Sequence, residues 1–382
     1  MKIAAFRVWL GFQVFLILYF FSGPSISQES DECSFCGDAN ELIERYSLRE
    51  SESPVSERSN WRPPIKIVTL YGEEVAIPLR DIAPDSVVVG VSGYDEAAEE
   101  IADADVLVTD WCTEDIISNG VNLRWVHTWA AGVDSCVSRP EFVEREILLT
   151  NTQRVYGVPI SQHAIALMLA LSNKLQTYHS EQASRQWTGV LNPDERGHIE
   201  LKGKTMFVVG LGGIGTEIAR LGHGLGMRVV ATRRSSRTGP GFVDYVGLSH
   251  ELLDLAKQAN VVINALPYTK ETIDIFDREF FDALPESALF VNIGRGESVN
   301  QEDLIVALES GRLAGAGLDV TYPEPLPDGH RLWSAPNLIL TPHVANSSDL
   351  NIWRADVIAW ENLRRYVEGG RILNVVDLEA GY

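Results

Sequence analysis

The chain has 382 residues, a length that suits two or three domains of ~150 residues each. With 45% apolar and 22% charged residues it can bury a large core, which excludes a mostly disordered protein. Acidic side chains outnumber basic ones 53 to 32, and the net charge is −21. Because such a surface repels phosphate backbones and anionic lipid, the composition argues against sequence-independent nucleic-acid binding.

The first 27 residues have the layout of a secretory signal peptide. Lys2 and Arg7 precede an apolar stretch at 8–21, and small residues follow it. This stretch is shorter than the ~20 residues of a membrane span, so a cleaved signal is favoured and an uncleaved anchor is the alternative. A misassigned start site would instead leave the protein in the cytoplasm. Residues 28–62 are rich in Ser, Glu and Arg, and they predict a linker with at most one short helix.

The four cysteines are too few for a disulfide-based fold of this length, and their spacing does not match a zinc site. Cys33 and Cys36 lie in the predicted linker, where they are either a small-loop disulfide of an exported protein or two free thiols. Cys112 and Cys136 have apolar or turn surroundings, and we expect them to be unreactive packing residues. The sequence therefore predicts no metal site.

From residue 64 onward, short apolar runs alternate with polar, amphipathic stretches. This alternation predicts repeated strand–helix units and a parallel sheet that helices cover on both faces. We assign residues 63–157 to a first domain of this kind. The runs that predict its strands are 65–69, 87–91, 106–109 and 125–128.

A longer helix is predicted after Pro159, because apolar residues recur there every three or four positions. The strand–helix alternation restarts at Lys204, so a second domain begins near this helix, and we place it at 158–343. The remaining residues, 344–382, contain a further predicted helix at 350–367 and a short tail.

A glycine-rich turn is the most informative segment of the sequence. It follows an apolar run at 205–209, opens a helix and precedes a second apolar run at 228–231. This setting is typical of a dinucleotide-binding turn: the first glycine permits the tight turn, the second lets the backbone approach a pyrophosphate, and the third lets helix and strand pack closely. The helix N-terminus offers free N–H groups to the anion. The predicted cofactor-binding residues of the turn are Gly210, Leu211, Gly212, Gly213, Ile214 and Gly215.

The end of the second strand bears on the choice of cofactor. Sites that prefer NAD place Asp or Glu there to bind the ribose hydroxyls, whereas this chain has Arg233, Arg234 and Ser235. Guanidinium and hydroxyl groups attract a 2′-phosphate that a carboxylate would repel. We therefore expect NADP(H) to be preferred, with NAD(H) as the alternative.

Five motifs in order resemble those of the D-isomer-specific 2-hydroxyacid dehydrogenases, the family of phosphoglycerate dehydrogenase and glyoxylate/hydroxypyruvate reductases. The resemblance spans about residues 63–375. It implies an α/β fold with two doubly wound parallel-sheet domains, in which a Rossmann-type cofactor domain is inserted into a flavodoxin-like substrate domain. It also implies a homodimer. The motifs are GLGGIG at 210–215, NALPYTKET at 264–272, FVNIGRGESVNQEDLIVAL at 290–308, GAGLDVTYPEPLP at 315–327 and LTPHVA at 340–345.

Arg295, Glu324 and His343 match the family's catalytic positions. The planar fork of Arg295 can hold the carboxylate and the carbonyl oxygen of a 2-oxoacid while staying charged. Because imidazole titrates near neutrality, His343 can donate a proton to the oxygen that becomes negative during hydride transfer. A carboxylate at Glu324 would favour the protonated ring and fix its orientation. His343 also follows a predicted strand at 338–341, at the carboxyl edge of the sheet where sites of α/β proteins form.

Other residues match further positions of the family. Residues 131–133 resemble the loop whose backbone N–H groups hold the substrate carboxylate, and a structural turn is the alternative. Asp319 matches the position that bonds the nicotinamide amide, with a helix cap or a buried pair as the alternative. Asn346 and Gln162 differ from the residues that are frequent at these positions of the family. The subfamily and the substrate are therefore not fixed by the resemblance. The substrate-binding residues so implied are Ala131, Gly132, Val133 and Arg295, and those around the cofactor are Leu266, Pro267, Thr272, Ile293, Gly294, Arg295, Asp319 and His343.

Together these features predict an NADP(H)-dependent reductase of small 2-oxoacids, of glyoxylate or hydroxypyruvate type. A nucleotide-sensing binding protein on a dehydrogenase fold is the alternative from another class, and the export-like N-terminus and the acidity argue against it. A formate-type specialisation is disfavoured, because such sites have Gln at the position of Glu324. The expected partners are a small substrate and the cofactor, not nucleic acid.

Overall fold

The computed structural model describes residues 38–187 and 197–381, which belong to one compact unit. The predicted signal peptide at 1–27, the start of the predicted linker, and Cys33 and Cys36 lie outside the described residues. Within the described ranges, no helix is both long enough and apolar enough to cross a membrane.

The first sheet is parallel and has five strands in the order β2-β1-β3-β4-β5. The four strands predicted from apolar runs are confirmed, and β5 was not foreseen. β3, β4 and β5 are buried along their whole length. The free edge of β5 is covered where Val375 forms an antiparallel bridge to Thr150, which removes an unpaired strand edge. The strands are β1 (Lys66–Thr69), β2 (Val87–Gly90), β3 (Val106–Thr109), β4 (Trp125–Thr128) and β5 (Leu148–Asn151).

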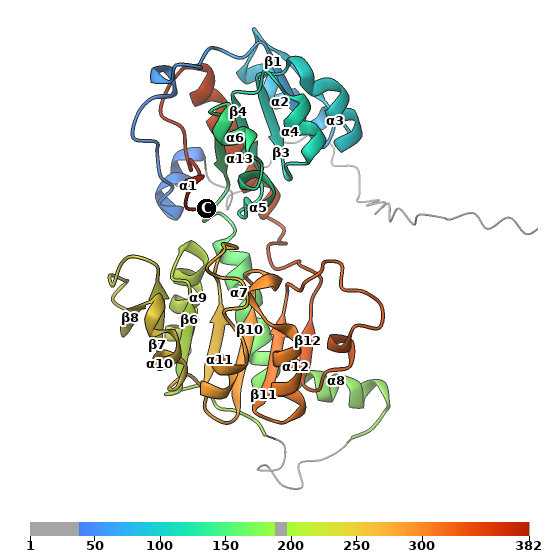
Figure 1. The fold of residues 1–382 in the computed structure, drawn as a ribbon, viewed down its shortest axis with the longest axis vertical. Coiled ribbons are helices and arrows are strands. Elements are labelled where there is room, and N and C mark those ends of the chain that lie inside the picture. Colours follow the sequence, from blue (N-terminus) through green and yellow to red (C-terminus); the bar gives the residue numbers. More distant parts are fainter. Residues whose placement is uncertain (1–37, 188–196, 382) are drawn as a thin grey trace, which may run out of the picture. The chain divides into compact units, whose positions relative to one another are not determined.

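The last helix of the chain returns to this first sheet. Helix α13 packs on α2, so the first half is built from both ends of the described chain (Figure 1). Helix α13 corresponds to the predicted helix at 350–367. The helices of this half are α2 (Glu73–Ile82), α3 (Tyr94–Glu100), α4 (Glu114–Asn119), α5 (Asp134–Val137), α6 (Glu141–Glu144) and α13 (Asn351–Val367), with the 3-10 turn η2 (Ile101–Asp103).

The second sheet is also parallel and has seven strands in the order β12-β11-β10-β9-β6-β7-β8. Strand β6 lies between β7 and β9, so the direction of winding reverses there. Ligands of open α/β sheets bind outside the carboxyl ends of the strands at such a reversal. The strands are β6 (Thr205–Val209), β7 (Arg228–Arg233), β8 (Tyr245–Leu248), β9 (Val261–Asn264), β10 (Ala288–Asn292), β11 (Leu313–Leu318) and β12 (Leu338–Leu340).

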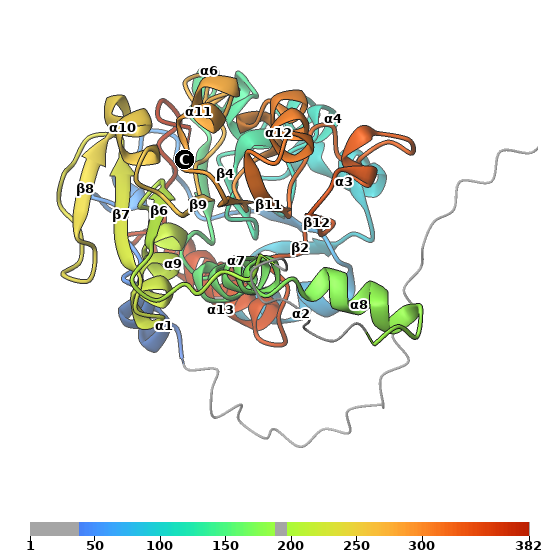
Figure 2. The same cartoon turned by 90° about the horizontal axis from the view of Figure 1, so that it is seen from below.

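Helices cover both faces of the second sheet. Figure 2 shows α7 and α9 on one face and α11 and α12 on the other. Asp277 and Asn300 begin α11 and α12 by accepting hydrogen bonds from the free amides of the first turn. The predicted fold class, two doubly wound parallel sheets, is confirmed. The elements are α7 (Gly157–Ser172), α8 (Leu175–Ala183), α9 (Gly213–Gly224), α10 (Leu252–Ala256), α11 (Arg278–Ala283) and α12 (Gln301–Glu309), with η4 (Ser249–Glu251), η5 (Gly296–Ser298) and η6 (Arg331–Ser334).

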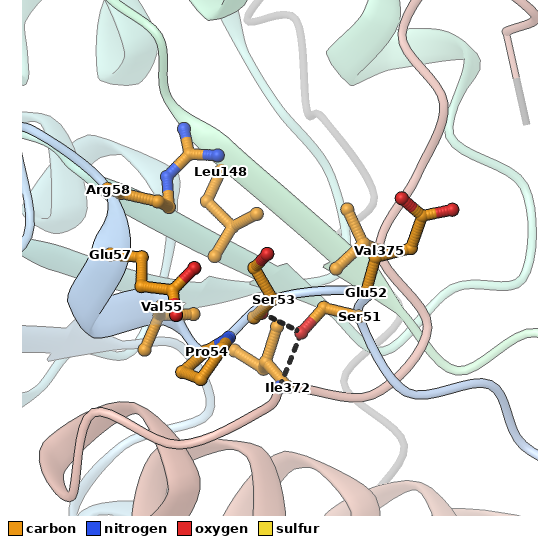
Figure 3. Close-up of a pocket in the computed structure, with 10 residues that line it drawn as sticks. All are labelled: Ser51, Glu52, Ser53, Pro54, Val55, Glu57, Arg58, Leu148, Ile372 and Val375. Atoms are coloured by element: carbon orange, nitrogen blue, oxygen red, sulfur yellow. Dashed lines mark hydrogen bonds between the residues drawn. The ribbon is translucent and has the colours of Figure 1, made fainter.

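The described part of the predicted linker, residues 38–62, is ordered along the C-terminal segment. It forms α1 (Ala39–Tyr46) and η1 (Val55–Glu57), and buries Leu42 and Val55. Ser51 bonds the backbone of Ile372, and a pocket of about 320 Å³ lies beside this contact (Figure 3). This segment is ordered with few buried apolar residues because its backbone bonds to the C-terminal segment. A local sequence pattern does not reveal this contact. The pocket includes none of the predicted site residues.

Candidate active site

The glycine-rich turn connects β6 to α9 as predicted. Gly210 has φ +97°, a conformation that favours glycine, and a Cβ there would lie 2.8 Å from the carbonyl oxygen of Ala265. A Cβ on Gly215 would lie 2.1 Å from the oxygen of Gly210, so helix and strand approach closely only because both residues are glycine. No side chain caps the helix at Gly212. The free amides of the first turn therefore fit the diphosphate of a dinucleotide.

The end of β7 carries positive charge beside this turn. Arg233 donates Nε to the backbone oxygen of Leu211, 2.8 Å away, and Leu211 donates its amide to Thr232. Arg234 and Ser235 follow and are exposed. No carboxylate occupies the end of this strand, so the arrangement fits a ribose that carries a 2′-phosphate.

A buried polar network supports the loops after β9 and β10. Asn264 donates to Asn292 and Ser298 at 2.8 and 2.7 Å, and all three side chains are buried. Asn264 also accepts from the amide of Leu266, and Ser298 donates to the oxygen of Arg295. A satisfied network of this kind fixes the backbone at both predicted cofactor loops. The same loops hold Pro267, whose oxygen accepts from Thr272, and the buried pair Ile293 and Gly294.

Arg295 follows β10 and forms an ion pair with Asp134. Its Nε and Nη2 lie 2.7 and 2.6 Å from one oxygen of Asp134, and Nη1 donates to the oxygen of Gly294. Asp134 begins α5, directly after the predicted substrate loop. A Cβ on Gly132 would lie 1.6 Å from Nη2 of Arg295, so a larger residue there would displace the guanidinium from this position. The structure thus brings the predicted substrate loop, 131–133, against the predicted substrate-binding arginine.

Glu324 and His343 form the second ion pair of the site. Nδ1 of His343 lies 2.8 Å from one Glu324 oxygen, and the other oxygen accepts from the amide of Thr321. The hydrogen bond to Glu324 raises the pKa of His343 above its usual value, although burial opposes the rise. Burial favours the neutral form of Glu324, but its hydrogen bonds from His343 and Thr321 outweigh this and lower the pKa of the carboxyl. Both pKa shifts favour the imidazolium–carboxylate pair.

Asp319 holds the loop that carries His343. It is buried, one oxygen accepts from the Thr341 hydroxyl and the Val344 amide, and the other accepts from the Ala345 amide. These bonds lie on both sides of His343, whose backbone has the left-handed φ of +52°. Both carboxylate oxygens of Asp319 therefore bond protein groups, and its assignment to the nicotinamide amide stays a prediction.

Several residues of the candidate site were missed from the sequence. Neither Asp134 nor the network around Asn264 was assigned. Asn264 and Asn292 leave a sequence signal, because each is the last residue of a strand. His163 on α7 was also missed, and its Nε2 lies 2.9 Å from the hydroxyl of Thr341. No group of metal-binding side chains occurs in the residues that the structure describes.

The expectation for Cys112 and Cys136 was wrong. The structure joins them in a disulfide, and both residues are buried. They are 24 residues apart in sequence. They meet because Cys112 follows β3 while Cys136 lies in α5 after β4, and β3 and β4 are neighbouring strands. The bond therefore ties the loop after β3 to the helix whose first residue, Asp134, pairs with Arg295.

Comparisons with known proteins agree with this geometry. Residues 165–345 match the NAD-binding domain of the D-isomer specific 2-hydroxyacid dehydrogenases. The chain is 34% identical over 259 residues to a glyoxylate reductase of Pyrococcus furiosus, covering 65% of this chain and 75% of that protein. This chain belongs to the D-isomer-specific 2-hydroxyacid dehydrogenase family. It is therefore an NAD(P)-dependent oxidoreductase that acts on small 2-oxoacids or 2-hydroxyacids.

Other members of the family are similar over most of their length. A mouse glyoxylate reductase/hydroxypyruvate reductase is 32% identical over 251 residues, covering 65% of this chain and 76% of the mouse protein. Among solved structures of the 2-hydroxyacid dehydrogenases, an NADPH-dependent glyoxylate/hydroxypyruvate reductase of Sinorhizobium meliloti, in complex with NADP and sulfate, has a TM-score of 0.72. That alignment has 26% identity and covers 83% of this chain and all of the other.

Removing the Cys112–Cys136 bond is expected to lower stability and weaken substrate binding. In a Cys33→Ser/Cys36→Ser background, we expect Cys112→Ala/Cys136→Ala to lower the free energy of unfolding by about 3 kcal/mol, because the open chain gains entropy. The KM for the 2-oxoacid should rise, since Asp134 loses its tether. Urea unfolding and steady-state kinetics measure both effects. A reductant should affect only the background protein, and unlinked thiols in non-reducing peptide maps of that protein would contradict the pairing.

Proposed function

We propose that this enzyme reduces small 2-oxoacids of the glyoxylate or hydroxypyruvate type and that NADPH is its preferred reductant. The observation that carries the proposal is the arrangement of Arg295 with the Glu324–His343 pair. The guanidinium of Arg295 follows β10. His343, which can release a proton and is paired with Glu324, follows β12. A 2-oxoacid needs both groups, because it brings a carboxylate to be bound and a ketone oxygen to be protonated.

The hydrogen bonds of Arg295 leave two of its N–H groups for the substrate. Of its five N–H groups, three donate to Asp134 and Gly294. One N–H therefore remains on each terminal nitrogen. Such a pair binds a carboxylate or a carboxylate with its neighbouring carbonyl oxygen. Asp134 thus sets the direction in which the catalytic arginine presents its charge.

His343 is placed to move the proton. Because Nδ1 is bonded to Glu324, the ring nitrogen that can face the substrate is Nε2. A nicotinamide cofactor, when bound, would supply the hydride, and His343 would donate its proton to the substrate oxygen that becomes negative. Glu324 favours the protonated ring, because its hydrogen bond raises the pKa of His343, and it fixes the orientation of the ring.

The preference for NADPH is supported by charge at the end of β7. Arg233, Arg234 and Ser235 replace the carboxylate that would bind the ribose hydroxyls of NAD. Structures of several relatives were solved as complexes with NADP or NADPH. Reduction is the expected direction, because cells keep that cofactor mostly reduced.

A panel of substrates and both cofactors tests the proposal. With glyoxylate, hydroxypyruvate, pyruvate and phenylpyruvate, we expect kcat/KM to be highest for one of the first two with NADPH. His343→Gln should lower kcat by ~10²-fold or more, because the proton donor is lost. His250→Gln is the control, since that side chain is 72% exposed on the surface. Near-normal turnover in the His343 variant, or a clear preference for NADH, would overturn the corresponding part of the proposal.

The pH dependence of reduction should reveal the Glu324–His343 pair. The protonated ring is the active form, so the reductive kcat/KM should be level at low pH and decline as pH rises through the raised pKa of His343. Glu324→Gln removes the carboxylate that raises this pKa, so the decline should move to lower pH. A decline at unchanged pH in that variant would show that Glu324 does not control His343.

We also infer that the chain is exported or anchored to a membrane. The layout of residues 1–27 supports this, and so does the Cys112–Cys136 disulfide, because such bonds persist in oxidising compartments. Sequencing the mature N-terminus after cell fractionation is the test. A cytoplasmic protein that starts at Met1 and has reduced Cys112 and Cys136 would refute the inference.

A further inference from the structure

Arg154 covers the first turn of the cofactor helix. It lies between β5 and α7, and its backbone has the left-handed φ of +74°. Its side chain lies against the glycine-rich turn: a Cβ on Gly213 would lie 2.9 Å from Cγ and 3.5 Å from Cβ of Arg154. Gly213 therefore leaves the space that the stem of Arg154 fills. An arginine from outside the glycine-rich motif thus stands at the N-terminus of α9.

The charge of Arg154 has no acidic partner among the residues that the structure describes. Its Nη1 donates to the backbone oxygen of Ser47 at 3.1 Å, whereas Nε and Nη2 have no protein acceptor in that part of the chain. Burial lowers the pKa of Arg154, and the charges of Arg49 and Arg233 lower it further. Arg154 and Arg233 thus both contact the glycine-rich turn, and the charge of Arg49 also acts on Arg154. Like charges held together in this way are typical of a site for an anion.

The geometry points to Arg154 as a residue that binds the diphosphate of the nicotinamide cofactor. This inference rests on the family's use of a dinucleotide, not on the proposed substrate. The diphosphate is favoured over the 2′-phosphate because Arg154 lies over the first turn of α9, whereas Arg233 stands at the end of β7, where the ribose binds. A charge-assisted bond from Arg154 would add to the backbone amides of the turn.

A purely structural role is the competing explanation, because Arg154 also bonds the end of α1. Two ligands, each carrying only one of the two phosphate-bearing parts of NADP⁺, show which part Arg154 contacts. ADP-ribose contains the diphosphate and no 2′-phosphate, and adenosine 2′-phosphate contains only the latter. Binding of these two ligands, of NADP⁺ and of NAD⁺ can be measured by titration calorimetry, which needs no catalysis.

Arg154→Gln is expected to weaken binding of ADP-ribose, NADP⁺ and NAD⁺ by about tenfold each, since one charge-assisted hydrogen bond is lost. The ratio of the NADP⁺ and NAD⁺ affinities should not change, and adenosine 2′-phosphate should bind as before. Arg154→Lys should recover part of the affinity, because it keeps the charge. Arg45→Gln is the matched control, an arginine of α1 that pairs with Glu41.

A second variant, together with Tm measurements, distinguishes lost binding from misfolding. Gly213→Ala pushes the stem of Arg154 away and should weaken ADP-ribose in the same way, while Tm reports whether each variant is folded. Unchanged ADP-ribose affinity in a folded Arg154→Gln protein would overturn the inference. A loss confined to NADP⁺ and adenosine 2′-phosphate would also overturn it, because Arg154 would then bind the 2′-phosphate. Absence of turnover with every 2-oxoacid would count against the proposed function alone.

Discussion

The ion pair between Arg295 and Asp134 is the contact on which the candidate site depends. It joins the loop after β10 of the second sheet to α5 of the first, and the two residues are 161 positions apart. One partner alone would leave a partly buried charge without compensation, which is costly. With both present, the arginine is held in one orientation. Gly132 permits this close approach, and the Cys112–Cys136 bond holds the segment that supplies Asp134.

Local positive charge allows this strongly negative protein to bind anions. The chain has a net charge of −21, yet its family binds two anions, a 2-oxoacid and a dinucleotide. Arginines placed at the ends of β5, β7 and β10 provide local positive potential within this negative protein. At these short distances a neighbouring cation outweighs distant charges, which salt screens. In the same way, Glu324 favours the protonated form of His343, because it is bonded directly to the ring.

Two features that the sequence did not reveal share one physical origin. Cys112 and Cys136 looked like packing residues because their local surroundings are apolar, and their pairing depends on β3 and β4 being neighbours. Residues 38–62 looked like a linker because they lack an apolar period. They are ordered by backbone bonds to the C-terminal segment, more than 300 residues away. Long-range pairing of this kind leaves no periodic pattern in the sequence.

The sequence by itself determined the strand–helix alternation, the glycine-rich turn and the identities of Arg295, Glu324 and His343. These features are local: a strand is a short apolar run, and a tight turn requires glycine wherever the backbone must approach another atom. Only the tertiary structure decided the partners, namely Asp134 for Arg295, Asp319 for the loop of His343, and Arg154 for the turn. Asp134 and Arg154 follow β4 and β5 of the first sheet, whereas Asp319 follows β11 of the second, so only the packing of the folded chain brings each partner to its place.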